Sequence, residues 1–177
     1  ALALANNRQG LCGIAPECKF MPVQVADQRG LMTITSVLDG ILYSIYQGAN
    51  VVNVSLGLCF AQADQLPLPA QQDIVNNHFK EEERLWREVM RIAAKKNCTI
   101  VVAAGNEKIL AGVDALHRPE LFITVAATGR QNQMLDRSEF SNFGDDVTIS
   151  APGVDIVSSV GNNEFVAMSG TSMAAPI

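Results

Sequence analysis

The sequence Gly170-Thr171-Ser172-Met173-Ala174-Ala175-Pro176 places a serine between a glycine and a run of small residues. Glycine permits a tight turn, and alanines let a following helix pack closely against a sheet. A serine at the start of such a helix has an exposed hydroxyl near the positive end of the helix dipole, which suits a nucleophile. The same pattern is also typical of an ordinary helix N-cap. Both interpretations stay open on these residues alone.

A second segment, Val101-Val102-Ala103-Ala104-Gly105-Asn106-Glu107, is an apolar strand that ends in small residues and a carboxamide. The Asn106 side chain is suited to donate a hydrogen bond to an anionic oxygen that forms at the carboxyl end of the strand. The alternative is a turn residue that closes the strand by a local hydrogen bond.

The apolar pattern alternates between short runs and helix-length segments. Strands are predicted over residues 20–25, 51–54, 99–103 and 122–126. A helix from Ile34 to Ile45, ended by Gly48, lies between the first two strands, and an amphipathic helix from His78 to Lys96 precedes the third. This alternation predicts an α/β fold with three layers, α/β/α, around a mostly parallel, doubly wound sheet.

Residues 59–78 contain Pro67 and Pro69 and are predicted to form a loop or an insertion within this one domain. The chain has 177 residues, which is enough for one domain with a sizeable core.

The composition excludes several classes of partner. A formal net charge of −5 gives no support to binding of nucleic acid or of an anionic membrane, and no apolar run is long enough to span a membrane. Cysteines at 12, 18, 59 and 98 lack the spacing of a zinc site. A Cys12–Cys18 bridge and reduced thiols both fit that spacing, so the compartment, secreted or cytoplasmic, stays open.

Five segments together resemble the subtilase family of serine proteases, peptidase S8. In chain order they are residues 13–16, 52–57, 103–106, 150–154 and 170–176. Residues 170–176 resemble the family's nucleophile motif, and residues 103–106 its oxyanion-asparagine segment. The resemblance implies a subtilisin-like fold and a serine endopeptidase that forms an acyl-enzyme intermediate.

The resemblance also implies a role for each matching residue. Ser172 would be the nucleophile, and Asn106 would donate to the oxyanion beside the Ser172 backbone N–H. Two segments would flank the substrate's P1 side chain, namely Ser55, Leu56 and Gly57 on one side and Ala103, Ala104 and Gly105 on the other. Gly30, Leu31 and Met32 would pair with an extended peptide substrate.

The match fails at the residues that would activate Ser172. The family's catalytic Asp and His precede the segment that resembles residues 13–16, and residues 1–12 contain neither. His78 and His117 match no base position. We therefore expect residues 1–177 to be a partial catalytic domain, incomplete at both ends and inactive without the rest of the parent chain.

The resemblance implies a structural calcium ion as a candidate ligand. Peptide-bond hydrolysis by such a protease needs no cofactor. Ala5, Asn7, Gln9 and Leu11 lie in a loop that binds Ca²⁺ in many relatives, through an Asn side chain and carbonyl oxygens. Arg8 lies inside this loop and argues against the cation.

Three functions are therefore compared. The leading hypothesis is an endopeptidase that acts on peptides or proteins. The alternatives are a non-catalytic binding protein with the same fold, and a partner-docking role for residues 59–78. Glu107 would favour a basic P1 residue by its charge, whereas the small residues 103–105 would leave room for a large apolar one.

Overall fold

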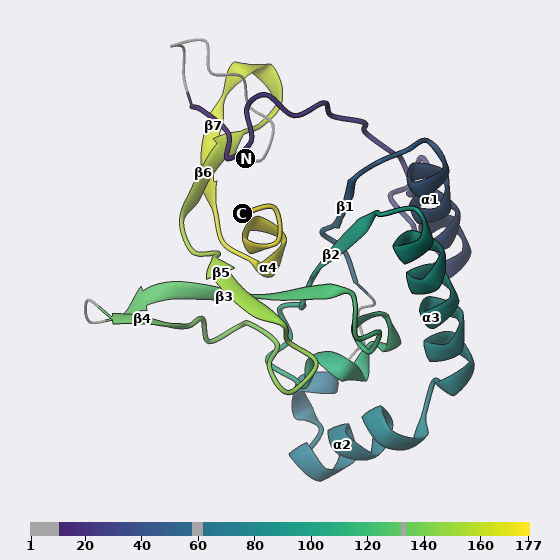
Figure 1. Cartoon of the computed structure of the whole chain (residues 1–177). Helices are drawn as coiled ribbons and strands as arrows, with labels where there is room; N and C mark the ends of the chain where they lie inside the picture. The colour runs from purple at the N-terminus through teal and green to yellow at the C-terminus, as the bar shows by residue number, and fades with distance from the viewer. Residues whose placement is uncertain (1–10, 58–61, 132–133) are drawn as a thin grey trace.

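A computed structural model describes residues 11–57, 62–131 and 134–177. A five-stranded sheet forms the centre, and a separate two-stranded hairpin lies beside it (Figure 1). The strands are β1 (Val51–Val54), β2 (Thr99–Ala103), β3 (Ile123–Gln131), β4 (Met134–Arg137), β5 (Ile149–Pro152), β6 (Ile156–Ser159) and β7 (Phe165–Met168). The α-helices are α1 (Ile34–Tyr46), α2 (Leu68–Asn77), α3 (Lys80–Lys95) and α4 (Thr171–Ala174).

The sheet is mixed but mostly parallel, as the sequence predicts. Strand β2 pairs in parallel with β1 and β3, and β5 pairs in parallel with β3. Only β4 runs antiparallel, against the far end of β3, among the strands that the structure describes in this sheet. The hairpin consists of β6 and β7.

Helices cover both faces of the sheet, which gives the predicted α/β/α layers. Because successive side chains of a strand point to opposite faces, β2 contributes to two cores. Ile100 and Val102 pack in the core that α1 and α3 cover, with Trp86 of α3 only 3% exposed. Ala103 packs in the other core, against Ala174 of α4. Figure 1 shows α4 across the sheet from α1 and α3.

Local chemistry explains where the longer helices begin and end. Thr33 caps α1, since its hydroxyl accepts from Ser36 N at 3.1 Å while Ser36 Oγ accepts from Thr33 N at 3.0 Å. Gly48, at φ +83°, follows the end of this helix, as expected. Helix α3 begins with three glutamates and ends with Lys95, which matches the helix dipole.

The strand predicted over residues 20–25 is wrong, because this segment forms no regular structure. Pro22 lacks the N–H that a strand would donate. One of its apolar residues, Val25, packs against the hydrophobic core that α1 covers, and a Val25 methyl group occupies the space where a Cβ on Gly40 would stand.

Residues 59–78 are not simply a loop. They contain a 3-10 turn (Ala63–Gln65) and helix α2, with residues 58–61 outside the described part. Pro67 and Pro69 suggested a loop, but proline also fits the first turn of a helix, where its missing N–H costs nothing. His78 is correspondingly not the first residue of the amphipathic helix; it ends α2, and α3 starts at Lys80.

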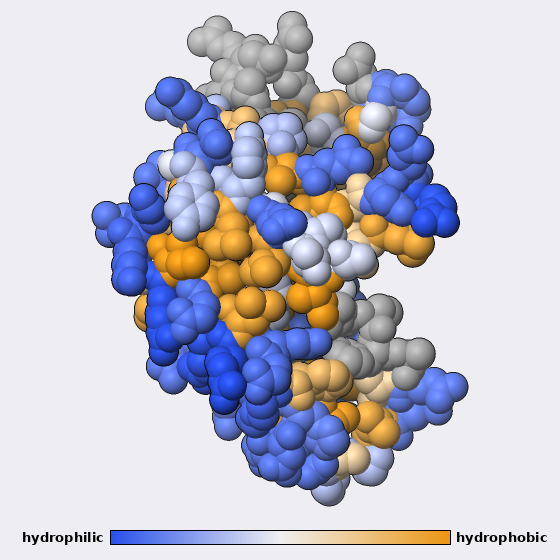
Figure 2. Space-filling model, turned by 90° about the vertical axis from the view of Figure 1, so that its right-hand side faces the viewer, coloured by the Kyte–Doolittle hydropathy of each residue, from blue (hydrophilic) through white to orange (hydrophobic). Residues whose placement is uncertain are grey.

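The face that carries α1 and α3 shows hydrophobic residues beside strongly hydrophilic ones (Figure 2). Helix α1 also has two exposed tyrosines, Tyr43 and Tyr46, which are 53% and 64% exposed. Across the described residues, no helix combines the length and the apolar character needed to cross a membrane.

Candidate active site

Three segments that are distant in sequence meet at the carboxyl ends of β1 and β2. Val54 pairs with Val102, so Ser55 and Gly105 leave neighbouring strands at the same edge of the sheet, where open α/β folds place their sites. The start of α4 lies against both. Ser172 Oγ donates to the Ser55 carbonyl oxygen at 3.2 Å, and Ser55 Oγ donates to the Ser172 carbonyl oxygen at 3.1 Å.

Thr171 fixes the orientation of the Asn106 carboxamide. The Thr171 backbone N–H donates to Asn106 Oδ1 at 2.9 Å, and the Thr171 hydroxyl donates to the same oxygen at 3.1 Å. This hydroxyl also accepts from Gly105 N at 3.1 Å, and Thr171 is fully buried. Because two donors hold the oxygen of the Asn106 amide, its Nδ2 end is left to donate elsewhere. Asn106 itself is exposed.

One buried amide determines the shape of the loop that carries Asn106. Asn142 Oδ1 accepts from Glu107 N at 3.0 Å and Ile109 N at 3.1 Å, while its Nδ2 donates to the Ala104 carbonyl at 2.9 Å. Gly105 has a φ of +101°, and a Cβ there would collide with the side chains of Asn142 and Glu107. This loop therefore tolerates little variation.

The Glu107 carboxylate is engaged inside the same loop. Its Oε2 accepts from Asn106 N and from Asn142 Nδ2, both at 2.9 Å. We infer that Glu107 holds the loop together. This placement weakens the hypothesis that Glu107 selects a basic P1 residue.

Both histidines form hydrogen bonds away from Ser172. His117 is buried, with Nδ1 3.1 Å from the Ala111 carbonyl oxygen and Nε2 3.0 Å from the Ala103 carbonyl oxygen. Burial lowers the pKa of His117, against the opposing effect of nearby carboxylates. His78 is exposed, and its Nε2 lies 3.2 Å from Asp73 Oδ2.

Gly30, Leu31 and Met32 are exposed and precede α1. Asp27 fixes the turn before them, because its Oδ1 accepts from Arg29 N at 2.8 Å and from Leu31 N at 2.9 Å. Within the described part of the chain, the hydrogen bonds that join Ser55, Asn106 and Ser172 do not extend to this segment.

Three of the four residues suggested for calcium, Ala5, Asn7 and Gln9, lie outside the described residues, and only Leu11 is inside. The described ranges contain no group of three or more His, Cys, Asp or Glu residues that would hold a metal ion. The calcium hypothesis stays a prediction. Cys12 and Cys18 are both free thiols, so no bridge joins them in this structure.

The comparison with protein families covers the whole chain. Residues 1–177 match the model of the subtilase family, Peptidase S8. The chain belongs to the subtilase family. Its membership agrees with the resemblance that the five sequence segments show and with the α/β fold.

Two named relatives match nearly the whole length of this subtilase chain. A thermophilic serine proteinase of Bacillus sp. (strain AK1) is 35% identical over 176 residues, which are 99% of this chain and 38% of that protein. Thermitase of Thermoactinomyces vulgaris is 33% identical over 99% of this chain and 54% of its own length. The chain thus spans about half or less of these relatives.

Solved structures show the same fold. A cold adapted subtilisin-like serine proteinase matches with a TM-score of 0.63 and 26% identity over 86% of this subtilase chain and 48% of its own. The prenylagaramide maturation protease PagA has a TM-score of 0.69 over 94% of this chain and 54% of its own, at 24% identity.

Sequence reasoning missed the residues that hold the site in place. Thr171 stood inside the quoted motif, but only its hydrogen bonds reveal what it holds. Asn142 lies between Phe140 and Phe143, and a lone amide between aromatic residues was the available signal that a buried polar group is present.

Proposed function

We propose that this chain supplies the nucleophile, Ser172, and the oxyanion donor, Asn106, of a serine endopeptidase. The observation that carries the proposal is the clamp of Thr171 on Asn106 Oδ1, at 2.9 and 3.1 Å. It directs an amide N–H outward beside the residue that carries the serine hydroxyl. Membership of the subtilase family and the protease names of its relatives support the same function.

The chemistry follows from these positions. An imidazole from the remainder of the parent protein takes the proton of Ser172 Oγ, which attacks the peptide carbonyl carbon. The carbonyl oxygen becomes an anion, held by the Ser172 N–H and by Asn106 Nδ2. The same imidazole then returns the proton to the leaving amine, and water hydrolyses the acyl-enzyme. Before attack, the Ser172 hydroxyl must leave the Ser55 carbonyl to which it donates.

In this proposal, residues 1–177 do not supply the general base that takes the proton of Ser172 Oγ. His117 has both ring nitrogens on backbone carbonyls, and His78 pairs with Asp73 at the end of α2. We therefore assign the catalytic Asp and His to the parent protein outside residues 1–177. We expect residues 1–177 alone to leave peptides intact.

The substrate in this proposal is an extended peptide. Ser55, Leu56 and Gly57 after β1 would flank its P1 side chain on one side, and Ala103, Ala104 and Gly105 on the other. Gly30, Leu31 and Met32 are exposed, which suits backbone pairing with the peptide. No cofactor takes part in these steps.

The test uses the complete parent protein and a chromogenic peptide. The Asn106→Ala variant is expected to lower kcat about 10²–10³-fold with little change in KM, the magnitude known for the oxyanion asparagine of a subtilisin. Ser172→Ala should lose more, because the covalent route disappears. If Asn106 is only a turn residue, its variant will instead melt earlier and keep its kcat. Failure of Ser172 to react with a peptidyl phosphonate would favour the non-catalytic alternative.

A further inference from the structure

One glutamine of α2 is buried and extends from its helix to the segment that follows the Asn106 loop. Gln71 is 5% exposed and is the only buried residue of α2, a helix that the structure describes in full. Its Oε1 accepts from Leu110 N at 2.9 Å, and its Nε2 donates to the Leu66 carbonyl oxygen at 2.8 Å. A buried amide is costly unless both of its ends are paired. The Leu110 contact therefore joins α2 to a segment that lies 39 positions further along the chain.

Leu110 belongs to a hydrogen-bonded pair of segments that leads back to the proposed site. Residues 105–111 run alongside residues 140–143, from the Asn142 N–H that donates to the Gly105 carbonyl at 3.0 Å to the backbone bridge of Leu110. The Asn142 side chain joins the same two segments between these ends. Because protein interiors are close-packed and transmit strain, a displacement at Leu110 is passed along this pair to the residue before Asn106.

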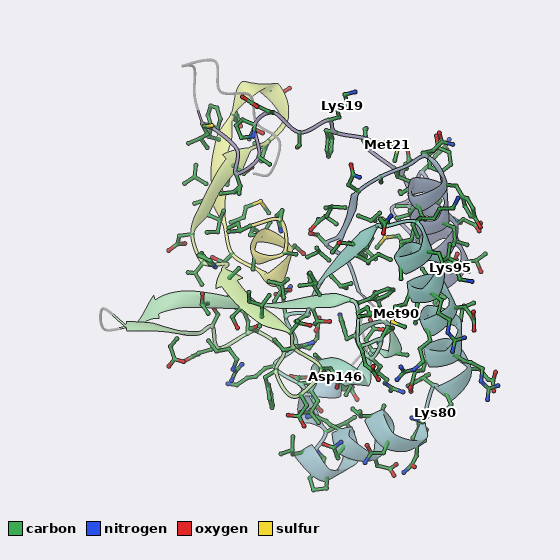
Figure 3. All side chains as sticks on the ribbon, viewed as in Figure 1. Lys19, Met21, Lys80, Met90, Lys95 and Asp146 are labelled. Atoms are coloured by element: carbon green, nitrogen blue, oxygen red, sulfur yellow. The ribbon has the colours of Figure 1, made fainter. Side chains whose placement is uncertain are left out.

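Apolar contacts hold α2 against the same segment. Ile74 and Val75 of α2 pack on a buried cluster that contains Ile109, which is 2% exposed. A Cβ on Gly112 would collide with the Asp146 carboxylate and would lie only 3.2 Å from a methyl group of Val75. Figure 3 labels Asp146 between the sheet and α2 in this view. Helix α2 is thus packed directly on the end of the segment that begins at the Asn106 loop.

We propose that Gln71 is a positioning residue for the reaction and that it keeps the Asn106 carboxamide aligned with the oxyanion. This inference rests on the proposed function of the site. Gln71 fixes the backbone of Leu110, and the paired segments carry this constraint to Asn106. Gln71 therefore acts on the loop from the side of α2, whereas Thr171 holds the amide oxygen directly. Small misalignments matter because an oxyanion donor works only at hydrogen-bond distance.

The test measures kcat and KM of the complete parent protein with a chromogenic peptide. Gln71→Met keeps the length of the side chain and leaves Leu110 N without its acceptor. It should lower kcat about three- to tenfold and change KM little, because the oxyanion contact is made in the transition state. Gln72→Met is the matched control, since Gln72 is exposed and its Nε2 donates to Asn76 Oδ1 within α2, at 3.2 Å. This control should keep the wild-type kcat.

A double variant separates positioning from a general loss of stability. In an Asn106→Ala background the group that Gln71 positions is gone, so Gln71→Met should lower kcat no further. Ile41→Val is the stability control, because Ile41 is 3% exposed in a different core cluster from Ile109. It should destabilise the fold and keep kcat. If Gln71→Met lowers kcat by the same factor with and without Asn106, the proposal is contradicted.

The remaining outcomes distinguish this inference from the proposed function. A wild-type kcat in Gln71→Met, beside a reduced kcat in Asn106→Ala, overturns the role of Gln71 and leaves the proposed function intact. A wild-type kcat in Asn106→Ala overturns the oxyanion role on which both depend. If Gln71→Met does not fold, Gln71→Asn decides, because its shorter amide stays polar and is withdrawn from Leu110 N. An unchanged kcat in Gln71→Asn then refutes the inference.

Discussion

Replacing Thr171 with valine should damage both stability and catalysis, because one hydroxyl serves two partners. It accepts from Gly105 N at 3.1 Å and donates to Asn106 Oδ1 at 3.1 Å. Valine has nearly the same shape and no hydroxyl, so the partners lose their hydrogen bonds without a large cavity. The variant thus isolates the polar contribution of Thr171.

The magnitude follows from what each partner retains. The Gly105 N–H loses this acceptor in a site where Thr171 is fully buried, and a buried unpaired donor costs about 1–3 kcal/mol of unfolding free energy. Asn106 Oδ1 keeps its bond from Thr171 N at 2.9 Å, so the amide is loosened and not lost. We therefore expect a kcat loss of about tenfold, smaller than the roughly 10²–10³-fold loss of removing such a donor.

The assay measures kcat and the free energy of unfolding in denaturant, both on the complete protein. Thr171→Ser is the control, since it keeps the hydroxyl and removes a buried methyl group, at about 1 kcal/mol. The serine variant should lose some stability and keep its kcat. A valine variant whose kcat equals that of the serine variant would refute the positioning role of the Thr171 hydroxyl.

Two further predictions concern the α1–α3 side of the molecule. Trp86→Ala should lower the unfolding free energy by about 3–5 kcal/mol, since Trp86 is 3% exposed, whereas Leu85→Ala, at a position 38% exposed, should cost far less in the same urea titration. Burial raises the pKa of Glu83, but hydrogen bonds from Lys80, Arg118 and Arg87 outweigh it and lower that pKa to about 2. A folded-state pKa below the unfolded value of 4.5 means that Glu83 stabilises the fold above that pH and loses this contribution as the pH falls from 4.5 to about 2. Glu83→Gln should therefore flatten that part of the stability curve, and an unchanged acid transition would show that these hydrogen bonds contribute nothing.

Much of the fold was predictable because its central strands are short, apolar and parallel. Residues 51–54 and 99–103 form strands with the bounds that the sequence predicts. The sequence was misleading at prolines, because a proline can interrupt a strand and can also occupy the first turn of a helix. Pro22 lies in an apolar segment that packs on α1 without forming a strand, and Pro69 lies in the first turn of α2.

The position of the site was predictable only to the extent that parallel pairing places the carboxyl ends of neighbouring strands at one edge of the sheet. Carboxyl ends of neighbouring strands share an edge, which agrees with the expected placement of residues 55–57 and 103–105 on two sides of one site. Hydrogen bonds then bring the start of α4 to this edge, from Ser172 to Ser55 and from Thr171 to Asn106. The contributions of Thr171 and Asn142 depend on side-chain contacts between distant segments, which no local pattern encodes. The chemical roles of Ser172 and Asn106 stay predictions until the variants are measured.

The hydrogen bonds at the site join residues that are far apart along the chain. Asn106 and Thr171 are separated by 65 positions, and Ser55 and Ser172 by 117. Contacts of such separation form late, because a long loop must close first. During synthesis, β1 and β2 emerge well before the α4 segment that orients the amide. The nascent polypeptide therefore cannot assemble the Asn106 clamp, and the arrangement of the proposed site is delayed until most of the described sheet has been made.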